Sequence, residues 1–217
     1  DREATAVLVA INSIFQVAMF GVMGWFYLQV LPGWLGLDTT SVEFSFWSIV
    51  TAVLVFLGIP LLLGVLSRVW GEKVKGREWF EDRFLPAVSP LAMIGLLYTI
   101  VLLFSLQGEQ LVAQPTAVVR VAIPLVIYFV GMFFLALGVA KAGGMNYAQS
   151  ASVAFTAAGN NFELAIAVSI GTFGAASAQA LAGTIGPLIE IPVLVGLVYV
   201  MLWIGPKLFP GDKSLPR

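Results

Sequence analysis

The sequence predicts an all-α, polytopic membrane protein, and three observations support that prediction. Of the 217 residues, 59% are hydrophobic and only 11% are charged, and the mean hydropathy is +0.97. Several apolar segments are long enough to cross a bilayer, and residues that favour turns separate them. A soluble domain of this length could not bury so much apolar surface. We therefore expect about six transmembrane helices in a single transmembrane domain, residues 1–217.

The expected spans cover most of the chain, and polar or breaker residues bound each of them. In order they are about 4–31, 46–70, 85–106, 118–140, 147–181 and 183–208. The expected connections contain Pro32-Gly33, Gly71, Gln107-Gly108, Gly143-Gly144 and Pro210-Gly211, all typical of turns. Because the segment Gly71–Arg83 mixes charges of both signs, we expect it to be a solvated loop.

The distribution of basic residues predicts the orientation. With six alternating spans, all of the 11 Lys and Arg residues except Arg120 fall on one side. By the positive-inside rule that side is cytoplasmic. We therefore expect a multi-pass protein of the cell (plasma) membrane with both ends of this chain cytoplasmic. The loops at Asp38–Glu43 and Glu109 then face outward, and Trp70 and Trp79 are expected at the membrane interface.

The fifth expected span contains a polar interruption. Gly159, Asn160, Asn161 and Glu163 lie in the middle of an apolar run from about Tyr147 to Ala182. An unbroken helix of that length would be about 50 Å long, whereas the hydrocarbon core of a bilayer is roughly 30 Å thick. Gly and Asn tolerate the left-handed backbone that ends many helices, and Asn160 with Glu163 has capping-box spacing. We expect the helix to stop near Gly159 and to restart near Asn160 or Asn161.

Two acidic residues, Glu163 and Glu190, are the only ones within the expected spans. Each would cost about 2.5–3.5 kcal/mol at a helix centre on insertion scales, so each needs compensation. Glu163 would lie in the first turn of the second half-helix, where the helix dipole favours a carboxylate; capping and transport are both open roles. Glu190 lies between Pro187 and Pro192, which remove two N–H donors from its helix. That coincidence favours a proton-coupling acid over a glutamic acid that only bonds a neighbouring helix.

Other polar residues give weaker signals. Asn12 and Gln16 are four residues apart and share a helix face, which suits either ligand contact or interhelical hydrogen bonding. The chain has no Cys and no His, so we expect no metal site in it, no disulfide and no cofactor. It has no basic patch, so we expect no nucleic-acid partner.

Broken helices within a membrane are where secondary transporters hold substrates and ions, which makes transport the leading hypothesis. An intramembrane enzyme that uses Glu163 and Glu190 as acid and base is the alternative from another class. No nucleophile, histidine or metal cluster accompanies the two carboxylates, so we expect no enzyme.

Two longer motifs resemble those of one transporter family. They are Phe-Thr-Ala-Ala-Gly-Asn-Asn-Phe-Glu-Leu-Ala-Ile-Ala at residues 155–167 and Gly-Pro-Leu-Ile-Glu-Ile-Pro-Val-Leu at residues 186–194. Both closely resemble the arsenite efflux permeases of the bile acid/arsenite/riboflavin transporter superfamily. Shorter similar segments occur at residues 12–16, 58–60 and 104–109, so the resemblance covers essentially the whole chain.

That resemblance implies ten spans in two inverted repeats of five, each with one broken helix. It also implies arsenical resistance through export of arsenite, and in some members antimonite, from the cytoplasm in exchange for protons. This chain would be a C-terminal fragment: the last span of the first repeat and all of the second. The first four spans, with the family's arsenite-coordinating cysteine, would be missing from it.

The resemblance also implies roles for particular residues. Glu190 would couple transport to protons or to a substrate hydroxyl. Gly159, Asn160, Asn161 and Glu163 would form the second-repeat half of the helix crossing, as a substrate or ion site. The expected partners are an arsenite or other metalloid oxyacid, protons and the lipid bilayer; the oligomeric state stays open. The alternative within the superfamily is a sodium-coupled organic anion symporter, because the equivalent region coordinates sodium in a related branch.

Overall fold

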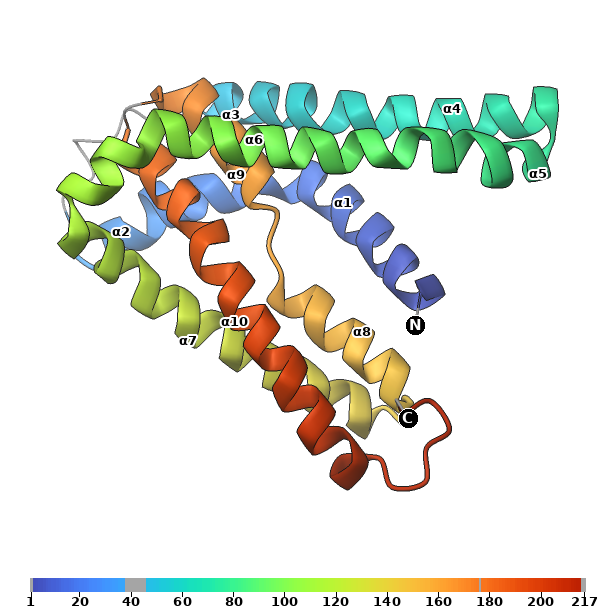
Figure 1. Cartoon of the computed structure of the whole chain (residues 1–217). Coiled ribbons are helices and arrows are strands. Elements are labelled where there is room, and N and C mark those ends of the chain that lie inside the picture. The colour runs from blue at the N-terminus through green and yellow to red at the C-terminus, as the bar shows by residue number, and fades with distance from the viewer. Residues whose placement is uncertain (1, 38–45, 176, 216–217) are drawn as a thin grey trace. The chain divides into compact units, whose positions relative to one another are not determined.

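The computed structural model describes residues 2–37, 46–175 and 177–215, and every regular element in these ranges is a helix (Figure 1). The predicted all-α fold class is thereby confirmed. The elements are α1 (Arg2–Trp25), η1 (Phe26–Val30), α2 (Leu31–Trp34), α3 (Phe46–Val53), η2 (Leu54–Gly58), α4 (Ile59–Lys75), α5 (Arg77–Trp79), η3 (Phe80–Phe84), α6 (Leu85–Ala113), α7 (Pro115–Ala142), α8 (Tyr147–Ala158), α9 (Phe162–Phe173) and α10 (Ala178–Leu208), where η denotes a π-helical turn.

Six helical stretches of the described chain are long and apolar enough to cross a bilayer, as the sequence predicts. They run over Ala4–Trp34, Phe46–Lys75, Arg77–Glu109, Pro115–Ala142, Tyr147–Phe173 and Ala178–Leu208. Their mean hydropathy over an 18-residue window lies between 1.3 and 2.8. The chain is therefore a multi-pass membrane protein.

Several expected connections are wrong, because the helix continues through them. Pro32-Gly33 lies inside α2, and Gln107–Glu109 lies inside α6 rather than in a loop. The expected loop Gly71–Arg83 reduces to one non-helical residue, Gly76, whose φ of 86° breaks the helix. A glycine inside a helix costs only about 1 kcal/mol, so apolar neighbours outweigh it. The expected loop Asp38–Glu43 lies outside the described residues.

The last connection also differs from the prediction, which placed it at Ala182. The structure places it between Phe173 and Ala178. Gly174 ends α9 with a φ of 89°, a conformation that glycine adopts without strain. At the start of α10, the backbone N–H of Ala180 donates to Ser177 Oγ at 3.1 Å, so the serine acts as the N-cap. Gly174 and Ser177 therefore determine where one helix ends and the next begins, although the sequence after them is apolar.

The helices divide into two compact units. Unit 1 comprises Asp1–Ile14, Leu111–Phe162 and Leu181–Arg217, and unit 2 comprises Phe15–Gln110 and Glu163–Ala180. The chain passes from unit 1 to unit 2 within the fifth span, directly after Phe162. The expected single transmembrane domain stays a prediction.

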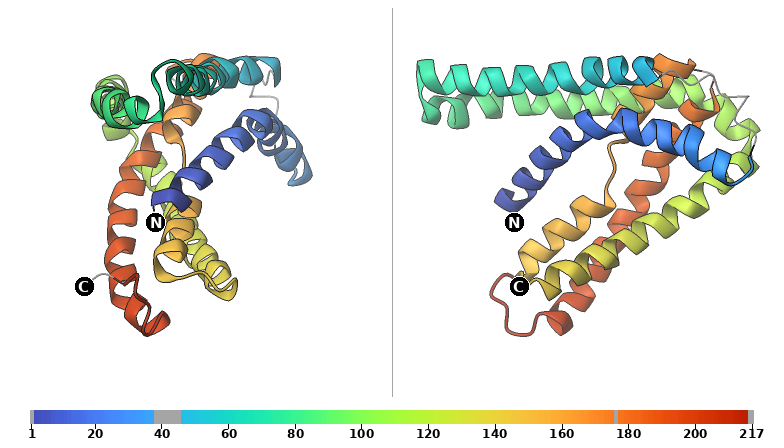
Figure 2. Two further views of the ribbon diagram at one scale, coloured as in Figure 1. Left: turned by 90° about the vertical axis from the view of Figure 1, so that its right-hand side faces the viewer. Right: turned by 180° about the vertical axis from the view of Figure 1, so that it is seen from behind.

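In unit 1, α7, α8 and α10 lie side by side (Figures 1 and 2). Their shared core consists of Phe133, Leu137, Tyr147, Ala154, Ala158, Leu197, Met201 and Phe209. Between α8 and α10, the ring of Tyr147 lies directly against Gly205. No side chain larger than hydrogen fits at that position without movement of the ring.

The N-terminus of α8 is capped by its own sequence. Asn146 Oδ1 accepts the N–H of Gln149 at 2.9 Å, and Gln149 Oε1 accepts the N–H of Asn146 at 3.3 Å. This reciprocal pair is a capping box. The N–H of Ser150 donates to the carbonyl of Asn146 at 2.9 Å, which begins the regular helix.

The C-terminal segment supplies the other two acceptors at this helix end (Figure 1). The N–H of Tyr147 donates to Asp212 Oδ2 at 2.7 Å, and the N–H of Ala148 donates to Ser214 Oγ at 3.1 Å. Ser214 in turn donates its N–H and its hydroxyl to Asp212 Oδ1, at 2.8 and 2.7 Å. We call Asp212 and Ser214 the C-terminal clasp. The donated bonds, chiefly those from the backbone of Ser214 and Tyr147, hold the pKa of Asp212 below its ordinary value of 3.8.

Unit 2 is built on a long antiparallel hairpin in which α3, η2 and α4 run beside α5, η3 and α6 (Figures 1 and 2). Near the hairpin tip the buried ring of Phe80 packs on Gly71, so that a Cβ added to this glycine would lie 2.9 Å from the ring. At the other end, α3 and α9 share a small apolar core formed by Ile49, Ala52, Val53, Leu164 and Val168.

The three π-helical turns of the described chain share a sequence context. Each ends two residues before a proline: η1 before Pro32, η2 before Pro60 and η3 before Pro86. A proline lacks the N–H that an α-helix would donate one turn back, and its ring crowds the carbonyl there. A wider turn relieves that crowding. Proline alone does not determine the outcome, because α10 carries Pro187 and Pro192 in an uninterrupted α-helix.

The contact between α8 and α10 predicts that Gly205→Ala destabilises unit 1. The added Cβ meets the buried Tyr147 ring, and such overpacking costs about 1–3 kcal/mol. Gly196→Ala, in the same helix, is the control, because nothing lies within 4 Å of an added Cβ there. The measurement is the melting temperature of detergent-solubilised protein, followed by size-exclusion chromatography. Equal melting temperatures for the two variants would contradict the assigned contact.

The clasp predicts that Asp212→Asn loosens the start of α8. An amide offers one acceptor oxygen where the carboxylate offers two, so Tyr147 and Ala148 should exchange their amide hydrogens faster, measured by mass spectrometry at neutral pH. Lys213→Gln, the residue between the two clasp members, is the control and should exchange like the unmodified protein.

The same clasp predicts the pH dependence of stability. Because the folded pKa of Asp212 is lowered, the carboxylate stabilises the protein at pH values above the ordinary 3.8. This contribution is lost as the pH falls through the lowered folded value. The difference in melting temperature between the unmodified protein and Asp212→Asn should therefore be constant above about pH 5 and vanish in strong acid. A difference that grew on acidification would contradict the assignment.

Candidate functional site

The interruption of the fifth span lies at Gly159–Asn161. α8 ends at Ala158 and α9 begins at Phe162, one residue later than the sequence suggests. Gly159 has φ −67° and ψ 153°, an extended conformation open to any residue, so the expected left-handed backbone is wrong here. Space is the reason that glycine suits this position. A Cβ would lie 3.3 Å from the carbonyl oxygen of Phe155 and 3.4 Å from a carboxylate oxygen of Glu190.

Glu190 reaches the interruption from α10. The backbone N–H of Asn160 donates to Glu190 Oε1 at 3.0 Å, and the glutamate is half-buried. Once α8 has ended, the backbone around Asn160 has no helical neighbours to bond, and an unmet N–H in hydrocarbon costs several kcal/mol. An intramolecular hydrogen bond contributes about 0.5–1.5 kcal/mol net. The bond therefore offsets two costs: that of the Asn160 N–H left without a helical partner and that of placing the Glu190 side chain in the membrane.

A third helix contributes Tyr128, a residue that no sequence motif marks as functional. Its hydroxyl donates to Asn160 Oδ1 at 3.4 Å, so α7, the interruption and α10 meet at one asparagine. The signal was present in the sequence, because a tyrosine hydroxyl within an apolar run needs a hydrogen-bond partner. Nothing in the sequence says which polar group across the fold supplies that partner.

Aromatic side chains form an apolar wall beside these polar groups. The ring of Phe162 lies directly against Gly186 of α10, where a Cβ would overlap it. Gly186 and Glu190 are four residues apart, so they share a face of the helix. Phe162 also meets Phe129 edge-on, with ring centres 6.3 Å apart. The wall thus extends from α7 to the same face of α10 that carries the glutamate.

The remaining candidate residues lie apart from this bonded group. Asn161 is half-buried within the interruption. Glu163 is exposed in the first turn of α9 and belongs to unit 2, whereas Glu190 belongs to unit 1. Because α9 begins at Phe162, Asn161 precedes it, and the expected box of Asn160 with Glu163 is out of register by one residue. On α1, Asn12 is exposed in unit 1 and Gln16 is half-buried in unit 2.

Acidic residues are too dispersed to suggest a metal centre. Over the residues that the structure describes, no three side chains of His, Cys, Asp or Glu come together to hold an ion. The functional groups at the interruption are the Glu190 carboxylate, the Asn160 amide and the Tyr128 phenol.

Residues 1–114 match the Sodium Bile acid symporter family. The chain belongs to this family. The matched residues cover α1 to α6 and end before α7, so the bonded group around Glu190 lies outside them.

Similar sequences extend the comparison over the remaining helices. The chain is 81% identical over 216 residues to the arsenical-resistance protein Acr3 of Corynebacterium glutamicum, covering 100% of this chain and 58% of that protein. It is 34% identical over 200 residues to Acr3 of Alkaliphilus metalliredigens, covering 92% of this chain and 54% of that protein. These similarities confirm the resemblance to arsenite efflux permeases.

An uncharacterized transporter of Synechocystis is 37% identical over 200 residues, which cover 92% of this chain and 50% of that protein. The chain therefore spans between 50% and 58% of the length of these three relatives. No solved structure matches it.

The bond from Tyr128 predicts a local effect of Tyr128→Phe. The ring keeps its packing on Phe129, but Asn160 Oδ1 loses its donor, at a cost of at most about 1 kcal/mol for so long a bond. Amide hydrogen exchange over residues 159–161 should accelerate by no more than about fivefold. Tyr199→Phe on the exposed face of α10 is the control. Equal amide hydrogen exchange over residues 159–161 in the two variants would contradict the assignment of Tyr128 to the site.

Proposed function

We propose that the protein is a secondary active transporter that exports arsenite, with antimonite as a second substrate, from the cytoplasm in exchange for protons. The observation that carries the proposal is the bond from the Asn160 N–H to Glu190 at the helix interruption. The 81% identity to an arsenical-resistance protein supports the choice of substrate. The proposed location is the plasma membrane, with both ends of this chain cytoplasmic, and the proposed role is transport rather than catalysis of a reaction.

Glu190 is suited to exchange because proton and substrate compete for it. An ionised carboxylate accepts several hydrogen bonds, so Glu190 can accept a hydroxyl of arsenous acid while Oε1 holds the Asn160 N–H. A protonated carboxyl group becomes a donor and loses acceptor capacity. Binding of a proton therefore favours release of the substrate, and loss of the proton restores the acceptor. An antiporter needs this competition at one group.

Asn160 supplies a complementary donor. Its Oδ1 accepts the Tyr128 hydroxyl, and its Nδ2 group can donate to an oxygen of the substrate. Gly159 leaves the space, and Asn161 adds a second amide at the interruption. Trivalent arsenic prefers thiolates, and the chain contains no cysteine. In the proposal, these residues accordingly bind the hydroxyl groups of the substrate and not the arsenic atom.

Glu163, Asn12 and Gln16 are secondary candidates. Glu163 lies in the first turn of α9, where the helix dipole favours a negative charge. Asn12 and Gln16 sit one turn apart on α1 and offer amide groups to a substrate or to a neighbouring helix.

The second candidate function is a sodium-coupled organic anion symporter. The family match to Sodium Bile acid symporters favours it, and amide and carboxylate oxygens at a helix interruption are the hard ligands that sodium prefers. The two functions differ in the driving ion and in the charge of the substrate, so transport measurements separate them.

Glu190→Gln should abolish arsenite resistance in an arsenic-sensitive host, reducing growth to that of cells without the transporter. The amide oxygen still accepts the Asn160 N–H, so the amount of protein in the membrane and its melting temperature should be unchanged. Glu109→Gln at the far end of α6 is the matched control and should retain resistance. Full resistance of Glu190→Gln would refute proton coupling at this residue.

Flux into everted vesicles tests the ion and the substrate together. Arsenite uptake driven by an imposed proton gradient, and unaffected by sodium, is the expected result. Uptake of a labelled bile acid that requires a sodium gradient would instead establish the second candidate function.

A further inference from the structure

The hairpin of unit 2 is longer than the membrane is thick. The stretch Phe46–Lys75 has 30 residues and the stretch Arg77–Glu109 has 33. At about 1.5 Å per residue these helices are roughly 45 and 50 Å long, whereas the hydrocarbon core measures roughly 30 Å. Charged residues gather at the end that carries Gly76, so the excess length lies there. The charged end of the hairpin therefore passes through the headgroup layer, and the residues next to the apolar start of α6 lie at that depth.

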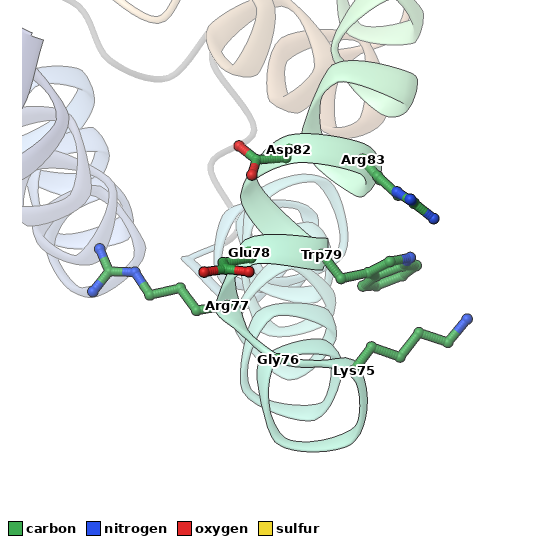
Figure 3. A pocket seen from close by; sticks show the side chains of 7 residues that line it. All are labelled: Lys75, Gly76, Arg77, Glu78, Trp79, Asp82 and Arg83. Carbon is green, nitrogen blue, oxygen red and sulfur yellow. The ribbon is translucent and has the colours of Figure 1, made fainter.

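At this tip Lys75, Trp79 and Arg83 point to one side, whereas Arg77 and Glu78 point to the other (Figure 3). We call Lys75, Trp79 and Arg83 the basic row. Lys75 and Arg83 are exposed. Together with the turn at Gly76, the row borders an open cavity of about 670 Å³.

Two contacts hold the ring of Trp79 in place. Lys75 Nζ lies 4.5 Å from the centre of the Trp79 ring, within range of a cation–π interaction. The Trp79 ring also stacks on the ring of Phe84, with ring centres 5.6 Å apart. The π-helical turn η3 makes this stack, because it aligns residues that are five apart. The Trp79 indole, held by these contacts, thus lies as an apolar group between the cationic side chains of Lys75 and Arg83 (Figure 3).

Some of the charged side chains around the tip form ion pairs with each other, and the others border the cavity. Arg68 pairs with Glu72 at 3.0 Å, and Arg77 pairs with Glu81 at 2.7 Å. The acids Glu78 and Asp82 also border the cavity, but their carboxylates point away from the basic row (Figure 3). Positive charge consequently dominates on the face that carries Trp79.

We propose that the basic row binds the phosphate of an anionic phospholipid. Lys75 and Arg83 would hold the phosphate, and the Trp79 ring would lie against the glycerol backbone. Two features favour a lipid over a soluble anion: the row lies at headgroup depth beside the first apolar residues of α6, and tryptophan prefers this interfacial layer. Basic clusters just outside transmembrane helices are attracted to anionic lipids. This site is separate from the interruption near Glu190 and does not depend on the transported substrate.

The test uses the purified protein, titrated in detergent with phosphatidylglycerol or phosphatidylcholine and observed by native mass spectrometry. Lys75→Gln combined with Arg83→Gln should weaken phosphatidylglycerol binding by about fivefold per charge, or roughly 25-fold. The matched control combines Arg68→Gln with Arg77→Gln, which removes the same charge from the two paired residues. The control should bind phosphatidylglycerol within about threefold of the unmodified protein.

Equal weakening in both double variants would overturn the proposal, because charge alone would then explain binding. Equal binding of phosphatidylcholine and phosphatidylglycerol would overturn it too, as would displacement of the lipid by excess inorganic phosphate.

A second measurement is independent of the charge variants and of their folding. Brominated phosphatidylglycerol should quench tryptophan fluorescence less in Trp79→Phe than in Trp70→Phe, because Trp79 lies in the basic row and Trp70 on the exposed side of α4. Equal quenching in the two variants would also overturn the proposal.

Discussion

In hydrocarbon, every backbone N–H and C=O must find a partner within the protein, and this constraint explains where the polar residues of the chain lie. An interrupted helix is the hardest case, because it exposes two further helix ends. The carboxylate of Glu190 meets one of the resulting N–H groups, that of Asn160. At the start of α8, Asn146, Gln149 and the C-terminal clasp accept the four N–H groups of residues 146–149, which have no helical partner. The half-helix that leads to the interruption is therefore capped at its start, and the first N–H group beyond Gly159 is bonded by Glu190.

Around Asn160, glycines provide the space and other residues provide the hydrogen-bonding groups. Small residues provide the shape: Gly159 admits the carboxylate, and Gly186 admits the Phe162 ring. The chemistry comes from side chains on two intact helices, Tyr128 on α7 and Glu190 on α10. For such a site we expect a change of the acid to remove the proposed activity and a change of the glycines to reduce order. Those two kinds of failure can be told apart by measurement.

Much of the fold could be predicted because it depends on local composition. The number of apolar helices and the polar interruption after Ala158 both follow from where polar residues fall in an apolar chain. The bond between Asn160 and Glu190 joins residues thirty apart, and the sequence indicated each of them separately but not their contact. Tyr128 cannot be identified from the sequence for the same reason, since packing determines its partner. The connection before α10 differs from the predicted position because the capping by Ser177 outweighs the hydropathy of the residues that follow it.

The π-helical turns have a consequence for how side chains are assigned to faces. Each such turn contains one residue more than an α-helical turn, so it rotates everything after it by about 100° relative to a regular helix. A single helical wheel drawn over Phe46–Lys75 consequently misassigns the residues on one side of η2. Two wheels, one ending at Val53 and one starting at Ile59, describe this stretch correctly. Scanning mutagenesis or cysteine labelling of these helices will show periodicities that change phase two residues before Pro32, Pro60 and Pro86.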